Sequence, residues 1–366
     1  MSLNFPTYES IGVRPLINCR GTYTIISGSV ILPEVRQAMV EASKRYVHMD
    51  ELMEAVGKRL GQLMGAEFGI VTNGCAAALC HVTAACIAGN EIEKMRRLPD
   101  TTGMKNEVIT QPSHRHIYDH AIRMAGAKMV EVKSVAELEA AVGERTAMIA
   151  VFGDAVDRSE VPLADLVRVG KQHGIPILVD AAAERPDTPN FYLQAGVDAV
   201  AYSGGKCLRG PQAAGMLLGR RDLLWTAFMN SAPHHALGRP MKAGKEEIMG
   251  LLAAVEMWGK RDHQAEWQEW ERRLQVITGA VGLFKGVSTT ISKPGRSNVA
   301  PVLFLHWDAE ALGLTPEEVQ KQLTEGEPRI EVFTHKDGVN FNPYMMELGE
   351  EPRVAQRLGE ILAKKG

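Results

Sequence analysis

The chain has 366 residues, of which 45% are hydrophobic and 23% are charged, a composition typical of a globular protein with one or two domains. Its formal net charge of −3 argues against a nucleic-acid-binding surface. No apolar run is long enough to span a bilayer, residues 1–6 lack the features of a secretory signal, and the five cysteines show no metal-like spacing. We therefore expect a cytoplasmic protein with reduced thiols and no membrane association.

The first fifty residues are expected to form an N-terminal arm and a first helix, over 33–46. From residue 51 onward, apolar runs typical of strands alternate with helical segments. Alternation of this kind predicts an α/β domain with a mostly parallel sheet, in which ligands gather at the carboxyl ends of the strands. The expected strands are 68–72, 108–110, 129–132, 148–152, 175–179, 197–202 and 215–218, and the expected helices are 51–64, 75–88, 118–125 and 163–173.

A long helical stretch is expected over 245–282, and the pattern then changes. Strands over 302–306 and 330–333 and helices over 316–323 and 352–364 predict a small α+β domain. The predicted organisation is therefore an arm at 1–50, a large domain at 51–285 and a small C-terminal domain at 286–366.

Two residues carry the clearest chemistry. Asp180 ends the apolar run that begins at Ile175, and Lys206 follows the next strand in Tyr202-Ser203-Gly204-Gly205-Lys206. Pyridoxal phosphate (PLP) requires such a pair, because a lysine holds the cofactor as a Schiff base and a carboxylate keeps the pyridine nitrogen protonated. Each residue alone also fits a plain role, as a solvated charge or as a helix cap or turn former. Together they favour a PLP site.

The turn Thr72-Asn73-Gly74-Cys75-Ala76 joins a strand to the start of a helix. Backbone N–H groups at a helix N-terminus favour a phosphate, and a glycine lets the backbone approach it closely. Ser203 offers a hydroxyl to the same phosphate. The alternative reading of the turn is a tight connection into a packing helix of small residues.

The segment from Ser113 to His120 follows a predicted strand and is rich in histidine. An imidazole or a phenol at this place could stack on the pyridine ring. A metal site using His114, His116 and His120 is the alternative. No acid or cysteine cluster supports that alternative, so we expect no metal.

The chain resembles the fold type I PLP enzymes, of the aspartate aminotransferase type, and within them the group related to bacterial L-seryl-tRNA(Sec) selenium transferase. The resemblance rests on Lys206 with its Gly-Pro-Gln-Ala continuation, on the Leu-Val-Asp strand end at Asp180, and on the Asn-Gly-Cys-Ala-Ala turn. The stretch His-Ile-Tyr-Asp-His-Ala-Ile-Arg-Met-Ala-Gly-Ala, from His116, is similar to the D-glucosaminate-6-phosphate ammonia-lyase branch of that group.

The resemblance implies a role for each site residue. Lys206 would form the Schiff base and Asp180 would face the ring nitrogen. His116 would stack on the ring, with His114 as the alternative. The residues implied around the cofactor phosphate are Gly74, Cys75, Ala76 and Ser203.

Two departures from the group bear on the substrate. The selenium transferase carries an N-terminal tRNA-binding domain, whereas the core here begins almost at once, which argues against tRNA. The wider group also often has an arginine after an Asn/Asp-Pro pair, whereas Asn342-Pro343 is followed here by Tyr344. Other basic residues must then hold the substrate carboxylate and phosphate, although each of them singly also fits an ordinary surface charge. The candidates are Arg20, Arg209, Arg239, Lys242 and Arg296.

The implied activity is a PLP-dependent lyase that eliminates water and ammonia from a polar 2-amino-3-hydroxy acid, such as D-glucosaminate 6-phosphate, to give a 2-keto acid. The residues leave open β-replacement, racemisation, aldol cleavage, decarboxylation and a PLP-binding protein without turnover. The expected partners are a small amino acid or amino-sugar acid and further copies of the chain, because fold type I sites are built across subunits. The protein is expected to form a homodimer or higher homo-oligomer. Loop residues Ser231, His234 and His235 are candidates to reach a neighbouring site, and the alternative for them is an ordinary surface loop.

Overall fold

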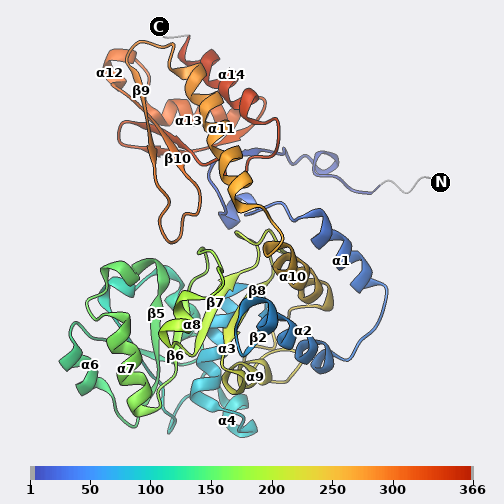
Figure 1. Cartoon of the computed structure of the whole chain (residues 1–366), viewed down its shortest axis with the longest axis vertical. Coiled ribbons are helices and arrows are strands. Elements are labelled where there is room, and N and C mark those ends of the chain that lie inside the picture. Colours follow the sequence, from blue (N-terminus) through green and yellow to red (C-terminus); the bar gives the residue numbers. More distant parts are fainter. Residues whose placement is uncertain (1–4, 364–366) are drawn as a thin grey trace. The chain divides into compact units, whose positions relative to one another are not determined.

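The computed structural model describes residues 5–363, which fall into two compact units (Figure 1). Unit 1 combines the N-terminal segment up to Gly28 with the chain from Asp262 onward, and unit 2 is Ser29–Arg261. These bounds differ from the expected boundaries at residues 50 and 285. The difference has a packing cause, since α1 (Pro33–Ser43) packs against α10 (Lys245–Trp258), and α11 (His263–Val281) packs against α14 (Glu351–Leu362).

Unit 2 contains a seven-stranded sheet with the order β2-β8-β7-β6-β5-β3-β4. Every strand runs parallel to the others except β8, which is antiparallel to both of its neighbours. The predicted α/β fold with a mostly parallel sheet is confirmed. The strands are β2 (Phe68–Thr72), β3 (Glu107–Thr110), β4 (Lys128–Glu131), β5 (Thr146–Phe152), β6 (Ile177–Asp180), β7 (Ala199–Ser203) and β8 (Gly215–Gly219).

Strand β6 determines which side chains face which helix. Side chains alternate between the two faces of a strand. Gly170 of α7 (Leu163–His173) packs on Ile177, whereas Leu178 and Asp180 border a cavity together with Leu79 of α3 (Gly74–Ala88). Asp180 therefore points to the face of the sheet that α3 covers, at the carboxyl end of a central parallel strand.

Several predicted helices differ from the observed ones. The stretch over 245–282 is broken between α10 and α11, where the Asp262 side chain accepts hydrogen bonds from the first N–H groups of α11. The helix expected over 118–125 is only a 3-10 turn (Ile117–Asp119) followed by α5 (His120–Arg123). Unit 2 further contains α2 (Met49–Met64), α4 (Ile92–Arg97), α6 (Val135–Ala141), α8 (Phe191–Ala195), α9 (Arg221–Met229) and the 3-10 turns Pro112–His114 and Gly153–Arg158.

Unit 1 is a small α+β unit, as predicted. Its antiparallel sheet has the order β12-β13-β10-β9, and the short strands β1 and β11 pair in parallel. The strand expected over 330–333 is two strands in different sheets, because the chain changes partner at the buried Val332. The strands are β1 (Ile17–Asn18), β9 (Val287–Ser292), β10 (Val302–Trp307), β11 (Ile330–Glu331), β12 (Phe333–His335) and β13 (Gly338–Phe341).

The core of unit 1 lies between this sheet and the helices α11, α13 (Pro316–Glu325) and α14, with Leu274, Leu305 and Leu358 among its buried side chains. The predicted last residue of the final helix, Lys364, lies outside the described residues. The remaining elements are α12 (Ala309–Leu312) and the 3-10 turns Glu9–Ile11 and Thr24–Ile26.

Two further observations concern the chain as a whole. Within residues 5–363, no helix is long and apolar enough to cross a membrane. All five cysteines are free and buried.

Candidate active site

Asp180 lies at the end of β6 with only 6% of its surface exposed. Its Oδ1 accepts hydrogen bonds from the backbone N–H of Ala182 at 3.1 Å and from the Cys75 thiol at 3.4 Å. Its Oδ2 lies 3.9 Å from Nε2 of His116, which is too far for a hydrogen bond. One carboxylate oxygen is therefore held by the protein, while no described residue donates a hydrogen bond to the other.

The turn at Gly74 begins α3 beside this carboxylate. Gly74 has φ of +79° and a Cβ at this position would meet no atom within 4 Å, so the glycine is explained by its backbone conformation and not by crowding. The N-cap residue, Asn73, makes no side-chain capping bond. The first N–H groups of α3 have no intrahelical partner, and Ala76 is exposed. This helix N-terminus has the space and the donors to bind a phosphate.

Cys75 occupies the first turn of α3, but its side chain points to Asp180. Burial, and then the negative charge of Asp180, raise the pKa of the Cys75 thiol well above its usual value, while the nearby Lys206 ammonium lowers it. The charges of Lys206 and Asp180 thus both influence the Cys75 thiol. Because the Cys75 thiol contacts the Asp180 carboxylate, it cannot also bind a phosphate. Only the backbone N–H of Cys75 is available to do so.

His116 is half-buried and stacks on Phe152, with ring centroids 4.0 Å apart and an interplanar angle of 18°. Its Nδ1 accepts the Tyr118 N–H at 3.3 Å, so in the neutral ring the proton is on Nε2, the atom nearest Asp180. Burial lowers the pKa of His116, although Asp180 and Asp119 favour its protonated form. His116 therefore presents a neutral ring whose second face is not used by Phe152.

His114 has a different environment. The Phe152 N–H donates to its Nδ1 at 2.9 Å, so Nε2 carries the proton and lies 2.8 Å from Ser159 Oγ. Burial lowers the pKa of His114 to about 4. Both ring nitrogens serve to hold Phe152 and Ser159, so His114 supports the residue on which His116 stacks. Within residues 5–363, no cluster of three or more His, Cys, Asp or Glu side chains could bind a metal ion.

A buried carboxylate holds the loop that carries His116. Asp119 forms ion pairs with Arg115 at 2.5 Å and with Arg123 at 3.1 Å, and Arg115 also contacts Glu131 of β4. Asp119 and Arg123 belong to the stretch that resembles the ammonia-lyase branch, and Arg115 directly precedes it. In this chain the charged residues of that stretch hold the loop at the edge of the sheet.

Lys206 lies in the turn that follows β7, after the half-buried Ser203. The Ser29 hydroxyl and the Gln212 amide both donate to the carbonyl of Gly205, at 2.9 Å each. A Cβ at Gly205 would approach the Gln212 side chain to 2.7 Å, so only glycine fits. This network fixes the backbone next to Lys206. No local sequence pattern predicts this network, because Ser29 is 176 residues away from Gly205.

The five basic candidates for substrate binding differ in their surroundings, and Arg296, in unit 1, is half-buried. In unit 1, Arg20 forms an ion pair with Glu331 and lies over the Phe333 ring. In unit 2, Nε of Arg209 donates to the Val30 carbonyl at 2.9 Å. Arg239 and Lys242 are exposed. Arg20 and Arg209 thus have structural contacts, whereas Arg239 and Lys242 extend from one loop of unit 2.

The three loop residues considered for a neighbouring site, Ser231, His234 and His235, differ in burial and in their internal contacts. The Ser231 hydroxyl is buried and donates to the Phe228 carbonyl at 2.8 Å. His234 contacts the same carbonyl through Nδ1 at 3.2 Å and lies 3.2 Å from Asp50 Oδ1. His235 is exposed. Of the three, His235 makes the fewest internal contacts.

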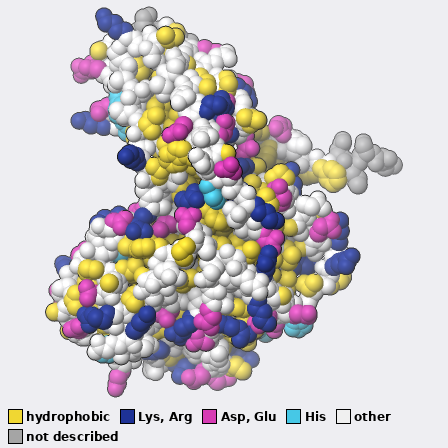
Figure 2. All heavy atoms as spheres, in the orientation of Figure 1, with side chains coloured by type: hydrophobic (Ala, Val, Ile, Leu, Met, Phe, Trp, Pro, Cys, Tyr) yellow, Lys and Arg dark blue, Asp and Glu magenta, His cyan; other side chains and the backbone are white. Residues whose placement is uncertain are grey.

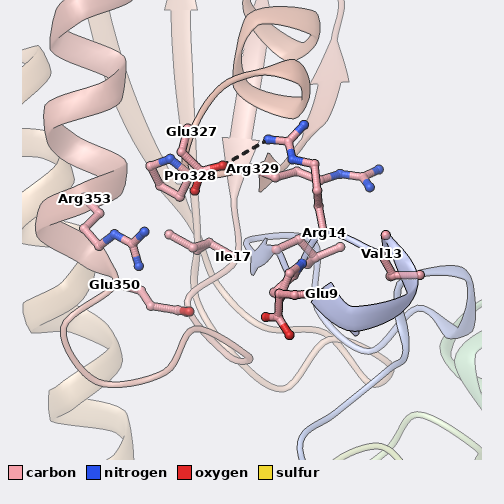
Figure 3. A pocket seen from close by; sticks show the side chains of 12 residues that line it. Glu9, Val13, Arg14, Ile17, Glu327, Pro328, Arg329, Glu350 and Arg353 are labelled. Carbon is pink, nitrogen blue, oxygen red and sulfur yellow. Dashed lines mark hydrogen bonds and ion pairs between the residues drawn. The ribbon is translucent and has the colours of Figure 1, made fainter. Parts of the chain in front are cut away.

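A cavity of about 490 Å³ lies in unit 1, between residues 9–17 and the segments around Glu327 and Glu350 (Figure 3). Arg14 and Glu327 at its border form an ion pair at 3.4 Å. Three arginines and three glutamates line the cavity, so its charges are balanced. On the face drawn in Figure 2, basic and acidic side chains are likewise interspersed.

Comparisons with known proteins relate this site to characterised ones. Residues 34–269 match the family model of L-seryl-tRNA selenium transferase. D-glucosaminate-6-phosphate ammonia lyase of Salmonella typhimurium is 30% identical over 97% of this chain and 97% of its own length. The 5'-C-glycyluridine monooxygenase-decarboxylase of a Streptomyces species is also 30% identical, over 98% of this chain and 92% of its own length.

A solved structure of D-glucosaminate-6-phosphate ammonia-lyase superposes with a TM-score of 0.87 at 28% identity, covering 98% of this chain and 99% of the other. The solved structures that share the fold are fold type I PLP enzymes. The predicted resemblance to this group and to its ammonia-lyase branch is confirmed.

Proposed function

The chain belongs to the L-seryl-tRNA selenium transferase family, and from this premise we propose that it is a PLP-dependent lyase. Its proposed reaction is the elimination of water and ammonia from a polar 2-amino-3-hydroxy acid. The observation that carries the proposal is Asp180, a buried carboxylate at a parallel strand end, one oxygen of which accepts no hydrogen bond from a described residue. Such a group is suited to pair with a protonated pyridine nitrogen.

The residues present fit PLP. The uncapped start of α3 at Gly74 would bind the phosphate, together with the backbone of Cys75 and Ala76 and the hydroxyl of Ser203. Asp180 would face the ring nitrogen, and His116 would cover the ring. When bound, PLP supplies an electron sink for the pair of electrons left when a bond to the substrate α-carbon breaks.

Lys206 has two proposed tasks in this site. Its amine would hold the cofactor before the substrate arrives, and it would then remove the α-proton as the general base. The same lysine could return this proton to the β-hydroxyl, which departs as water. His116, neutral and stacked on Phe152, would orient the ring without adding charge beside Asp180.

The overall reaction balances without an oxidant or a reductant. Loss of the α-proton and of the β-hydroxyl as water leaves a 2-enamine acid. This product tautomerises to a 2-imine acid, which takes up one water and releases ammonia. The substrate thus becomes a 3-deoxy-2-keto acid plus ammonia, with one water lost and one consumed.

For the substrate, we propose D-glucosaminate 6-phosphate. The name of the ammonia lyase relative supports it, as do the match over nearly the whole of both chains and the TM-score of 0.87. The exposed Arg239 and Lys242 would contact the two anionic ends of such a molecule. A second candidate outcome is decarboxylation of an amino acid, which is favoured by the equally identical monooxygenase-decarboxylase relative.

We further propose a cytoplasmic homo-oligomer, at least a dimer. Large hydrophobic side chains are exposed along the N-terminal part of the chain, which supports an interface with a second copy. The side chains of Phe5, Ile11, Ile25 and Tyr46 are 79%, 69%, 85% and 101% exposed. Light scattering of the active protein tests this proposal, and an active monomer would contradict it.

The test of the function is a product assay. The PLP-loaded protein is incubated with D-glucosaminate 6-phosphate, and 2-keto-3-deoxygluconate 6-phosphate and ammonia are measured. A panel of amino acids and amino-sugar acids is assayed in parallel for ammonia, keto acid and CO₂. We expect ammonia and keto acid in equal amounts from the sugar acid. CO₂ release or α-proton exchange from a simple amino acid, without product from the sugar acid, would favour the alternative outcomes, and absence of any turnover would leave a PLP-binding protein.

A further inference from the structure

We infer that Cys75 is a positioning residue for Asp180, whose thiol orients the carboxylate through one weak hydrogen bond and leaves its charge available to a bound pyridine ring. The inference rests on the proposed function for its catalytic meaning. The contact between the two side chains itself is a property of the chain without cofactor.

The geometry assigns the two oxygens of Asp180 different tasks. Oδ1 is held from two directions, by the Ala182 N–H and by the thiol at the start of α3. Oδ2 receives no hydrogen bond from a described residue, and Nε2 of His116 lies 3.9 Å away from it. Because two fixed donors bind Oδ1, the carboxylate cannot rotate freely, and the orientation of Oδ2 is fixed as well.

A thiol suits this task because it is a weak donor. Hydrogen bonds to a carboxylate favour its charged form and reduce its affinity for further protons. A hydroxyl at the same place would be a stronger donor and would withdraw more charge from Asp180. A methyl group would withdraw none but would leave the carboxylate oriented by Ala182 alone.

Cys75 is not suited to act as a nucleophile or as a redox sensor. It is buried, with 8% of its surface exposed, and its pKa is raised well above the usual value by burial and by Asp180. Reactive cysteines are exposed and have lowered pKa values. The thiol therefore stays protonated at neutral pH and remains a hydrogen-bond donor.

The first experiment uses the cofactor-free protein and infrared spectroscopy of the S–H stretching bands. The Cys75 band is identified by its loss in Cys75→Ala. We expect it to move to higher frequency in Asp180→Ala, which removes the acceptor, and to move less in Asp180→Asn. The band of Cys80, a buried cysteine on the same helix, should stay in place. A Cys75 band that is insensitive to both changes at Asp180 would overturn the inference.

The second experiment loads the protein with PLP labelled with ¹⁵N at the ring nitrogen. In Cys75→Ser, the pKa of the ring nitrogen should fall by about one unit, a tenfold change in its protonation equilibrium. Turnover should fall with it, and Cys80→Ser is the control for a buried Cys-to-Ser change on α3. An unchanged ring-nitrogen pKa in Cys75→Ser would refute the tuning role.

The two experiments separate this inference from the proposed function. If the wild-type protein binds no PLP, the proposed function fails, while the infrared bands still decide whether Cys75 holds Asp180. If PLP binds and turns over but neither measurement responds to Cys75, the function stands and the inference fails.

Discussion

Asn73 and Lys242 are joined by a hydrogen bond, in which Nδ2 of Asn73 donates to the Lys242 carbonyl at 2.8 Å across 169 residues of sequence. Asn73 is the residue before α3, so this bond ties the loop that carries Arg239 and Lys242 to the proposed phosphate-binding turn. The basic loop and the cofactor turn are therefore parts of one local structure, although neither sequence segment indicates the other.

Lys206 is expected to bind the cofactor covalently. The purified protein should be yellow, and borohydride should fix PLP to Lys206, as peptide mapping would show. Lys206→Ala should still bind PLP, more weakly, and should lose roughly 10²–10⁴-fold in turnover, the usual contribution of a general base. A protein that stays colourless after addition of PLP would sink the cofactor assignment.

Asp180→Ala is expected to slow turnover by roughly 10- to 1,000-fold, because an opposite charge close to a titrating nitrogen shifts the pKa of that nitrogen by about 1–3 units. Asp180→Asn should have a similar effect, since it removes the charge and keeps the shape. Steady-state kinetics, with PLP affinity measured separately, test this expectation. Wild-type turnover in Asp180→Ala would mean that Asp180 only completes the end of β6.

Replacing His114 and replacing His116 by alanine are expected to have different effects on turnover and stability. His116→Ala should lower turnover and leave the melting temperature nearly unchanged, because the ring is only half-buried and the Tyr118 N–H that it accepts belongs to an exposed residue, where water can replace it. His114→Ala should lower the melting temperature, because it leaves the Phe152 N–H without its acceptor. Kinetics and thermal unfolding of both variants test these expectations. If His114→Ala lowered turnover alone and His116→Ala lowered the melting temperature alone, the roles of the two residues would be exchanged.

These contrasts show what the sequence could and could not predict. Asp180, Lys206 and the Gly74 turn were predictable, because each depends on its position at the end of a strand or the start of a helix. The difference between His114 and His116 was not, since it depends on Phe152 and Ser159 at the ends of other elements. The Cys75 side chain likewise faces a residue 105 positions away. Contacts made by chain segments that are distant in sequence have no periodic signal.

His81 is expected to make the fold sensitive to acid. It is 1% exposed, and no described residue forms a hydrogen bond with either ring nitrogen. Burial lowers its pKa from 6.5 to about 4. Between these values the unfolded chain binds more protons than the folded one, so stability is full above pH 6.5 and falls as the pH decreases toward 4.

Replacing His81 should remove this loss. His81→Leu should be nearly neutral at pH 8, where no hydrogen bond is lost, and should be more stable than the wild type by about 2 kcal/mol at pH 5. Chemical unfolding at both pH values measures the difference, with His173→Leu, an exposed histidine of α7, as the control. An equal pH dependence in His81→Leu and wild type would show that other groups cause the acid sensitivity.

The last prediction concerns the basic loop that Asn73 holds. Arg239→Ala and Lys242→Ala should each raise KM for D-glucosaminate 6-phosphate about tenfold, because loss of one hydrogen bond between charged groups costs roughly 1.5–3 kcal/mol and exposure reduces this value. If a side chain binds the phosphate, its removal should leave KM for unphosphorylated D-glucosaminate unchanged. If it binds the carboxylate, both KM values should rise. Arg209→Ala is the contrast, since its Nε already donates to Val30, and it should lower the melting temperature without separating the two substrates. Wild-type KM values in both loop variants would exclude Arg239 and Lys242 from substrate binding.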